Sequence, residues 1–470
     1  MFELDLSYSV LLVICLVAAC GFEFVNGFHD TANAVATVIY TNSLKPWVAV
    51  IWSGFMNSMG VFYGGIAVAM GIVNLLPVET LIDQNIAHSI SMVAALLLSA
   101  IFWNLLTWYF GIPCSSSHTL VGSILGVGIA YSLLPGVQTA AVNWGKAQEI
   151  GLALLISPLI GFTLTIILMY LLRVTTKGRS YGDDLFKEPK KNTPPPVWIR
   201  GTLLLTCTFV SFFHGQNDGQ KGVGLIMLIL IGSVPGYFAL NANFESGKLT
   251  DPLVKVESVI KSIDPGPLSE PDRVRLASVI EINTRLQGTM APITKVNELP
   301  RDQRFSVRKD IIVMDRDLNS LVKKEEARVS QNDKKILKEN LSQIRKVIDY
   351  SPGGVIVMIS LSLGLGTMIG WKRIVKTIGE KIGKEHLSYA QGASAELVAA
   401  TTIGLASSYG LPVSTTHVLS SGIAGSMVAS KGVKNLQPDT VRNIIIAWCL
   451  TLPVVVLMSG TLFLIFRSIF

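Results

Sequence analysis

The sequence predicts an all-α integral membrane protein of about ten transmembrane segments, arranged as two inverted-topology repeats with broken helices. Three observations predict this fold. Half of the 470 residues are hydrophobic, only 15% are charged, and the mean hydropathy is +0.50. Apolar stretches of about 20 residues, long enough to cross about 30 Å of hydrocarbon, recur along the chain. Finally, two polar motifs each occur twice.

The apolar stretches set the expected spans. The first stretch, LVICLVAACG, resembles the end of a signal peptide. Residues 1–44 contain no Lys or Arg, so the positive region of such a signal is missing and we expect a membrane span. The expected spans are residues 9–40, 46–73, 86–110, 111–134, 149–173, 201–231, 353–371, 389–411, 412–429 and 443–467. The segments 111–134 and 412–429 are short, so each either spans or re-enters.

Charged loops predict the orientation. Basic residues crowd the connection 174–200 and the stretch 372–384, and such residues favour the cytoplasmic side. With one crossing per segment both regions fall on the same side, together with Lys431, Lys434 and Arg442. Both termini then lie outside.

A polar insert interrupts the second repeat. Residues 242–350 contain 20 Lys/Arg and 17 Asp/Glu, and their later part spaces Ile, Leu and Val as amphipathic helices do. By alternation the insert lies outside the membrane. The expected organisation is a first repeat (1–173), a cytoplasmic linker (174–200), the start of the second repeat (201–241), the insert (242–350) and the remainder of the second repeat (351–470).

Two motif pairs indicate a duplication. NGFHDTANAVATV at 26–38 aligns with HGQNDGQKGVGLI at 214–226, at an offset of 188 residues. GIPCSSSHTLVGS at 111–123 aligns with GLPVSTTHVLSSG at 410–422, at an offset of 299. The offsets differ by 111, almost the length of the insert, so one duplication and one insertion explain both. Five spans separate the copies, which therefore point in opposite directions through the membrane.

Glycines accompany the first motif pair. Gly27 with Gly215, and Gly219 with Gly222, predict that each helix breaks near the middle of the membrane. Polar side chains in hydrocarbon cost several kcal/mol without partners. We therefore expect the polar residues to face a shared site.

The second motif pair predicts two helix N-termini. In PCSSSHT (113–119) and PVSTTHV (412–418) a proline precedes three hydroxyl residues and an apolar run. Exposed N–H groups at a helix start bind oxyanions. Two such helix N-termini that face each other, here called the hydroxyl tips, can cage a tetrahedral anion with Ser115, Ser116, Ser117, Ser414, Thr415 and Thr416. The alternative is that these residues only cap their helices.

The carboxylates of the first pair predict coupling ions. Asp30 and Asp218 would repel an anion unless a cation lies between them, either Na⁺ or a proton on the carboxylate. Asn33 and Asn217 would add neutral oxygens. The alternative is that each Asp only caps a half-helix.

The remaining polar residues of the motifs are histidines and one lysine. His29, His118, His214 and His417 are four of the six histidines. A zinc site would lack the H-E-x-x-H spacing, so the alternative is that they are interior histidines with satisfied hydrogen bonds. Lys221 takes the place of Asn33 in the second copy. As a buried ammonium it needs a partner, either Asp218 or the substrate, unless it snorkels to the interface.

At these residues the chain resembles the inorganic phosphate transporter (Pit) family. The family pattern G-A-N-D-x-x-N is read here as GFHDTAN (27–33) and GQNDGQK (215–221), P-V-S-T-T-H stands unaltered at 412–417, and PCSSSH at 113–118 is its weaker first copy. The resemblance covers essentially the whole chain. The insert after the second motif is similar to that of the bacterial low-affinity, proton-coupled branch.

The resemblance implies inward transport of phosphate, held by the hydroxyl tips, with cations held by the motif Asp and Asn residues. Lys221 departs from the family pattern, and its contact with the substrate is expected from its buried charge alone. The resemblance adds Glu396 in S-A-E-L as a further cation residue, whereas Asn57 stands where sodium-coupled animal members have a glutamate. This departure, together with His29 and Lys221 in place of asparagines, favours coupling to H⁺ over Na⁺. The resemblance also implies that phosphate travels as a neutral divalent-metal complex.

Other functions and partners follow from the same motifs. The alternatives are a sodium-coupled phosphate symporter and a carrier of another tetrahedral oxyanion such as sulfate. An intramembrane hydrolase is a less favoured alternative, because the sequence has no serine in a nucleophile elbow. A phosphate sensor that uses the insert for signalling is a further alternative. We expect no catalytic residue, cofactor, resident metal or nucleic-acid partner. The expected setting is a lipid bilayer, specifically a bacterial inner membrane, and a homodimer stays open.

Overall fold

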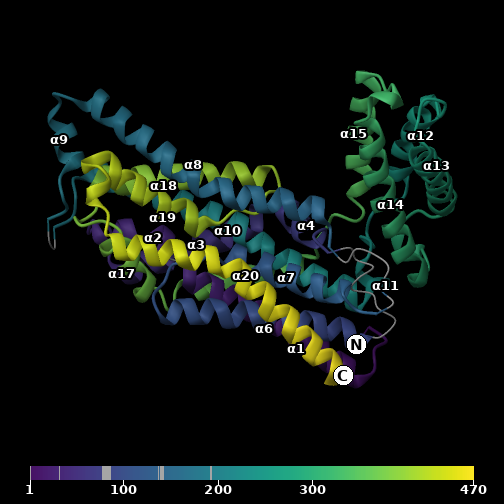
Figure 1. The fold of residues 1–470 in the computed structure, drawn as a ribbon, viewed down its shortest axis with the longest axis horizontal. Helices are drawn as coiled ribbons and strands as arrows, with labels where there is room; N and C mark the ends of the chain where they lie inside the picture. The colour runs from purple at the N-terminus through teal and green to yellow at the C-terminus, as the bar shows by residue number, and fades with distance from the viewer. Residues whose placement is uncertain are drawn as a thin grey trace. The chain divides into compact units, whose positions relative to one another are not determined.

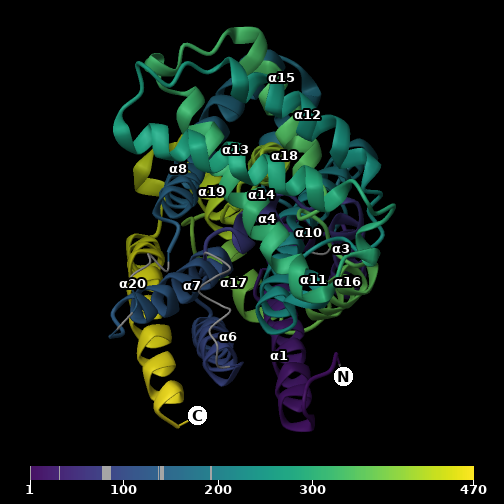
Figure 2. The ribbon, with the colours of Figure 1, turned by 90° about the vertical axis from the view of Figure 1, so that its right-hand side faces the viewer.

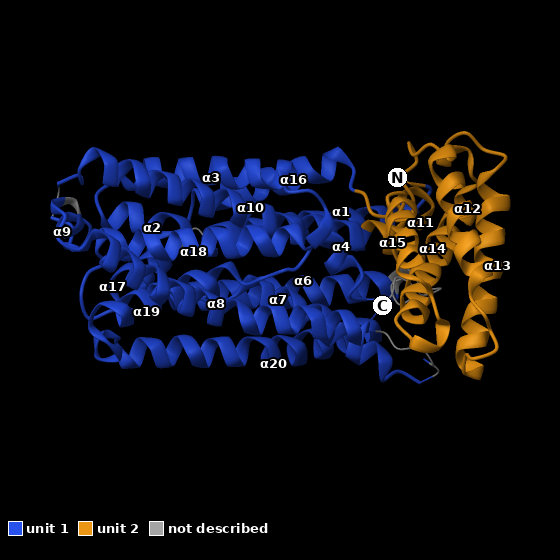
Figure 3. Cartoon of the chain, turned by 90° about the horizontal axis from the view of Figure 1, so that it is seen from above, with its two compact units in different colours: residues 1, 3–229, 351–470 blue, residues 2, 230–350 orange. Residues whose placement is uncertain are grey.

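A computed structural model describes residues 2–30, 32–76, 86–135, 137, 142–190 and 193–469. The described residues form helices joined by loops, with no β-strand beyond two isolated bridges. The chain divides into two compact units (Figure 3). Unit 1 contains residues 3–229 and 351–470, and unit 2 contains residues 2 and 230–350.

The first half of unit 1 follows the predicted apolar stretches, which end at loops rich in Gly, Pro and Asn. Its helices are α1 (Leu6–Asp30), α2 (Ala32–Tyr40), α3 (Pro46–Tyr63), α4 (Ala67–Val73), α6 (Ile86–Tyr109), α7 (Ser116–Ser132) and α8 (Trp144–Thr176), followed by the short α9 (Ser180–Phe186). Pro46 opens α3 at a position where its missing N–H costs nothing, and Asn143 caps α8 by accepting from the backbone N–H of Lys146.

The second half repeats this order. Its helices are α10 (Val197–Ser233), α16 (Gly353–Thr367), α17 (Lys372–Glu380), α18 (Tyr389–Ser408), α19 (Thr415–Lys431) and α20 (Pro438–Ile469). The pair α3 and α4 is bent by 76°, and the pair α16 and α17 by 63°. The last helix of each half, α8 and α20, carries one internal proline, Pro158 or Pro453. These shared irregularities agree with a duplicated fold.

The two halves exchange helices. α20 packs against α7 and α8 against α19, while α16 of the second half lies between α1 and α3 of the first. α7 and α19 start next to each other in the middle of unit 1 and run toward opposite ends (Figure 1). The fold is therefore an intertwined pair of inverted repeats, as the motif offsets predict.

Fewer helices meet a length and composition criterion for a full span than the ten predicted segments. By length and composition, five helices of the described chain can cross a membrane, or up to seven if each bent pair is one span. α7 and α19 have only 17 residues each, and α18 is too polar for this criterion. α7 packs against α6 and α19 against α18, so the segments 111–134 and 412–429 form the returning arms of two hairpins.

The predicted helix break at the second motif is wrong. α10 continues without interruption through residues 214–222. In the first motif α1 ends at Asp30 and α2 begins at Ala32. The glycines of α10 serve close packing instead, because a Cβ on Gly215 would lie 2.1 Å from the carbonyl oxygen of Asn57, and one on Gly219 would lie 2.2 Å from Val61.

The two ends of unit 1 carry different parts of the chain. The start of α1 and the end of α20 lie at one end, whereas α9 and α17 lie at the other (Figures 1 and 3). The basic stretches 174–200 and 372–384 belong to the second end. Both termini of unit 1 are therefore opposite to the basic connections.

Unit 2 is a helical bundle with its own apolar core (Figure 2). It begins at Leu230, whereas the sequence places the start of the insert at residue 242. Its helices are α11 (Pro235–Phe238), α12 (Gly247–Ser262), α13 (Glu270–Met290), α14 (Arg301–Val322) and α15 (Gln331–Arg345). The predicted amphipathic stretch forms α14 and α15, whose apolar faces supply Leu318 and Leu341 to the core.

Candidate functional site

The predicted hydroxyl tips are two helix N-termini that meet inside unit 1. Ser115 caps α7 by accepting from the backbone N–H of His118, and Ser414 caps α19 in the same way from His417. The imidazole centroids of His118 and His417 lie 4.6 Å apart, and the His417 ring stacks on Trp448 at 3.9 Å. The positive ends of two helix dipoles therefore converge at one place.

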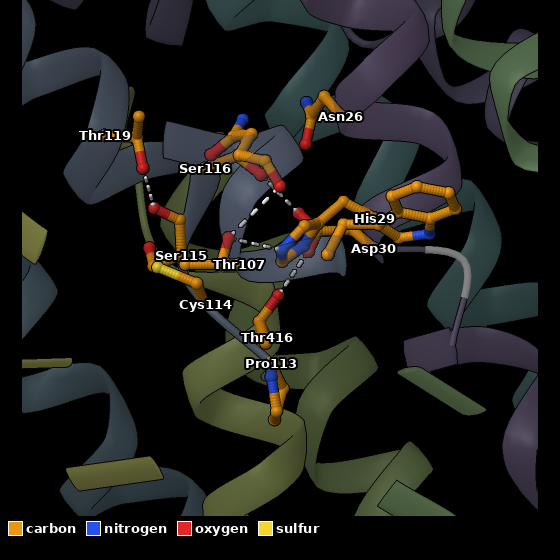
Figure 4. Close-up of polar contacts among 12 residues, drawn as sticks. Asn26, His29, Asp30, Thr107, Pro113, Cys114, Ser115, Ser116, Thr119 and Thr416 are labelled. Carbon is orange, nitrogen blue, oxygen red and sulfur yellow. Dashed lines mark hydrogen bonds and ion pairs between the residues drawn. The ribbon is translucent and has the colours of Figure 1, made fainter. Parts of the chain in front are cut away.

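Asp30 receives hydrogen bonds from both tips (Figure 4). Ser116 Oγ donates to Oδ2 at 3.0 Å, and Thr416 Oγ1 donates to Oδ1 at 2.5 Å. His29 Nδ1 lies 3.2 Å from Oδ1, and its Nε2 lies 3.2 Å from the hydroxyl of Thr107 on α6. The carboxylate at the end of α1 thus holds the α7 and α19 tips together.

Lys221 has the partner that the sequence offered for it. Its Nζ donates to Asp218 Oδ1 at 2.5 Å, one helical turn away on α10. It also donates to Ser117 Oγ at 2.5 Å and to the carbonyl of Val413 at 3.0 Å. With 2% of its surface exposed, Lys221 does not snorkel. It joins α10 to both tips, because Val413 precedes α19.

His214 lies between the two aspartates. Its Nε2 is 3.3 Å from Asp218 Oδ2 and 3.9 Å from Asp30 Oδ2, while its Nδ1 is 3.1 Å from Asn57 Oδ1. Asp30, His214 and Asp218 each offer one buried ligand atom, and these atoms lie within 4.8 Å of one another. Carboxylate and imidazole ligands of this kind suit a divalent ion such as Zn²⁺.

The remaining predicted site residues take different positions. Asn217 donates to Ser407 at 2.9 Å and to the carbonyl of Leu411 at 3.1 Å, so it fastens α10 to the loop before the α19 tip. Glu396 on α18 accepts from Thr206 of α10 at 2.5 Å. Within the described residues, Glu396 forms no hydrogen bond with the tips. The side chain of Asn33 lies outside the described residues.

The six tip hydroxyls divide by role. Ser115 and Ser414 cap their helices, as the simpler alternative predicts. Ser116 and Thr416 bind Asp30, and Ser117 contacts Lys221. Within the described chain, the buried hydroxyl of Thr415 has no hydrogen-bond partner. Three tip hydroxyls therefore meet the charged groups of the first motif pair.

Sequence reasoning missed several polar residues near this site. Thr107 and Thr206 are ordinary helix residues by sequence, and only the fold brings them to His29 and Glu396. Glu23 and Asn26 precede Asp30 by seven and four residues, so all three lie on one face of α1. A polar stripe inside an apolar helix is a signal that could have found them.

The fold and the site together define a class of protein. Buried charged groups and two opposed helix tips lie where the two inverted halves of a helical membrane protein meet, which is the architecture of secondary transporters. The chain accordingly has the architecture of a multi-pass membrane transporter.

Comparisons with known proteins identify the family. A model of the phosphate transporter family matches residues 26–459. The low-affinity inorganic phosphate transporters PitA and PitB of Escherichia coli K12 are 40% and 39% identical to this chain, each over 98% of it and 97% of their own length. The chain belongs to the phosphate transporter family, which confirms the resemblance found in its motifs.

A solved structure supports the fold. The sodium-dependent phosphate transporter matches with a TM-score of 0.56 over 98% of this chain and 100% of its own, at 20% sequence identity. A probable low-affinity inorganic phosphate transporter of Bacillus subtilis is 29% identical over the whole of both chains. The shared helical fold therefore extends across the described chain.

Proposed function

We propose that this protein imports inorganic phosphate by proton symport, through alternating access around the site at the two tips. The observation that carries the proposal is the sharing of hydroxyl donors. Ser116 and Thr416 both donate to Asp30, and the same hydroxyls belong to the helix N-termini that suit a phosphate ion. The carboxylate and the substrate anion therefore compete for the same donors.

This competition supplies a coupling mechanism. A proton on Asp30 removes its negative charge and weakens its hold on the two hydroxyls, which then bind phosphate. By linkage, phosphate at the tips raises the affinity of Asp30 for a proton to the same degree. Proton and phosphate then enter together, and the neutralised site permits rocking of one half against the other.

Lys221 supports H⁺ over Na⁺ as the coupling ion. Its ammonium already balances Asp218, which is the position equivalent to Asp30 in the second copy. A fixed cation takes the place that a second metal cation would otherwise occupy. His29 and His214 place imidazole nitrogens 3.2 Å and 3.9 Å from the Asp30 carboxylate, and an imidazole can donate or accept a proton.

A second observation supports a metal as part of the cargo. Asp30, His214 and Asp218 can contribute three ligand atoms. We propose that a divalent ion travelling with phosphate contacts His214 and Asp218 of this group while Asp30 carries the proton, so that the complex enters with little net charge. Desolvation of a neutral complex costs less than desolvation of a phosphate anion.

Uptake of ³²P-phosphate into proteoliposomes tests the proposal. The conditions are an inward proton gradient without Na⁺, with and without Mg²⁺, for wild type and Asp218→Asn. We expect gradient-driven uptake in the wild type, stimulation by Mg²⁺, and loss of uptake in Asp218→Asn. Asp439→Asn is the control, because that carboxylate is 88% exposed. Uptake that starts only when Na⁺ is supplied contradicts proton symport.

The setting follows from the same proposal. The basic connections at one end of unit 1 support a cytoplasmic position for that end, and both termini then lie outside. The relatives PitA and PitB come from the bacterium Escherichia coli, which supports a bacterial inner membrane for this protein.

A further inference from the structure

Glu23 is a buried carboxyl group that the mechanism above does not use. It lies on α1, and its side chain is fully buried. Asn26 Nδ2 donates to Glu23 Oε2 at 3.2 Å. The other carboxyl oxygen, Oε1, has no hydrogen-bond partner within the part of the chain that the structure describes, and neither has Asn26 Oδ1.

Packing holds this carboxyl against α10. A Cβ added to Gly222 would lie 2.4 Å from Glu23 Cγ and 2.6 Å from Oε1, so only a glycine leaves room for the acid. Gly222 directly follows Lys221. Glu23 therefore lies beside the helix turn that carries the charged groups of the site. Figure 4 shows Asn26 next to the Asp30 contacts, on the same face of α1.

Glu23 interacts electrostatically with Asp218, Lys221 and His214 of α10, and with Cys20 of its own helix. α16, which packs on α1, has no titratable residue. The titratable residues of α6 and α2 are His88, Tyr109 and Tyr40, and none of these is among the charges that act on Glu23.

Lys221 donates no hydrogen bond to Glu23 in this arrangement of the described residues. An ammonium has three N–H donors, and those of Lys221 are directed to Asp218, Ser117 and Val413. An ionised Glu23 would then keep an anionic oxygen without a donor in a place that water does not reach. A buried charge of this kind is costly, and a bound proton removes it.

We propose that Glu23 is a further proton-binding residue of the transport cycle, with Asn26 as the residue that orients its carboxyl group. Protonated, Glu23 leaves the contacts of Lys221 with Asp218 and Ser117 intact. When the proton leaves, the carboxylate attracts Lys221 away from these partners and so loosens the α7 tip. The proton on Glu23 thus decides how firmly Lys221 holds the tip. This inference rests on the proposed proton symport.

Two transport assays on Glu23→Gln separate coupling from binding. Phosphate–phosphate exchange at equal pH on both sides needs no net proton movement, whereas uptake driven by a proton gradient does. We expect Glu23→Gln to keep exchange within about twofold of the wild type and to lose about tenfold or more of gradient-driven uptake, a change typical of a lost coupling free energy. A trapped pH dye should record fewer protons entering per phosphate.

Two further variants serve as controls. Glu149→Gln removes a carboxylate whose side chain is 50% exposed on α8, and it should behave as the wild type in both assays. Glu23→Asp keeps the acid on a shorter side chain, and it should retain gradient-driven uptake with an altered pH profile.

Three results would overturn the inference. Gradient-driven uptake by Glu23→Gln at the wild-type rate shows that the acid carries no coupled proton. Loss of exchange together with uptake, in Glu23→Gln or in Glu23→Asp, makes the residue structural. A wild-type protein without proton-driven uptake refutes proton symport, and the inference with it, whatever Glu23→Gln does.

Discussion

At the scale of single residues, Lys221 connects the two motif pairs. Its ammonium lies 2.5 Å from both Asp218 Oδ1 and Ser117 Oγ, and 3.0 Å from the Val413 carbonyl. One side chain thus links α10 to the tips of α7 and α19. In the first copy of the motif the same position is Asn33, which carries no charge. The two copies are therefore not equivalent in charge.

Lys221→Met should destabilise the protein and abolish uptake. The substitution leaves Asp218 buried without its ammonium partner, and breaking a buried ion pair costs about 3–5 kcal/mol. Thermal unfolding in detergent, followed by tryptophan fluorescence, measures the loss. Adding Asp218→Asn removes the uncompensated charge, so the double variant should regain stability but not transport.

The matched control is Lys146→Met. Lys146 pairs with Glu149 at 2.9 Å, and these side chains are 21% and 50% exposed, so its removal should cost less than about 1 kcal/mol. If Lys146→Met and Lys221→Met lower the unfolding temperature equally, the buried pair makes no special contribution.

Many of the site residues could be predicted from the sequence, but few of the contacts between them could. Lys221 and Asp218 are three residues apart on a helix, so their pairing follows from helical spacing. The meeting of the two tips follows from the inverted repeat. The sharing of Asp30 between Ser116 and Thr416 does not, because it depends on side-chain positions that only the packed helices fix.

At the scale of helices, glycine sets how closely the two halves approach. A Cβ on Gly60 of α3 would lie 2.0 Å from the Phe212 carbonyl, and one on Gly366 of α16 would lie 2.1 Å from that of Phe24. Small residues at such crossings are typical of membrane helices. A glycine can break a helix or allow a neighbouring helix to pack closely, and the sequence does not distinguish these two roles. The predicted break in α10 was wrong for this reason.

Gly215→Ala should therefore lower the stability of unit 1. The added methyl group would overlap the Asn57 carbonyl oxygen at 2.1 Å, and overpacking of this kind costs about 1–3 kcal/mol. Gly201→Ala on the same helix meets no atom within 4 Å and should be neutral or slightly stabilising. Unfolding temperatures measured in detergent compare the stability of the two variants. A larger loss for Gly201→Ala would contradict the close crossing.

The helices of unit 2 should respond independently of the transport helices, because their core is their own. Leu318 of α14 is fully buried in that core, and Leu318→Ala should cost about 2–5 kcal/mol. Hydrogen exchange followed by mass spectrometry should record faster exchange in residues 240–350 and unchanged exchange in α1 and α10. Val274→Ala, at a side chain 62% exposed, is the control and should change neither region. Faster exchange throughout unit 1 in Leu318→Ala would contradict two separate cores.

At the scale of the whole molecule, the duplication accounts for most of what the sequence could predict. Matching motif offsets identify the inverted repeat, and the bent pairs and the prolines of α8 and α20 repeat with it. The exchange of α7 and α19 between halves could not be predicted, because packing partners leave no periodic trace in an apolar helix. The charge of the connections predicts an orientation, which labelling can test.

Single cysteines in a background without the five native ones should report this orientation. Glu3→Cys and Ser468→Cys mark the termini, and Lys309→Cys marks unit 2. Lys187→Cys lies in the basic connection 174–200, and Lys434→Cys lies in the loop before α20, which pairs with the basic stretch 372–384; both mark the basic connections, and all five positions are exposed. A maleimide that cannot cross membranes should label the termini and unit 2 in intact cells. It should label the basic connections only after permeabilisation, because basic loops stay on the cytoplasmic side.

The pattern of labelling separates two ways of being wrong. Termini and basic connections lie at opposite ends of unit 1, so they must label from opposite sides, and the same side for both would contradict the fold. Opposite sides with the basic connections outside would leave the fold intact and reverse the orientation. Phosphate import would then have to begin from the end of α9 and α17, where the positive charge would attract phosphate from the medium. Labelling of Lys309→Cys with the basic connections would refute the external position of unit 2 alone.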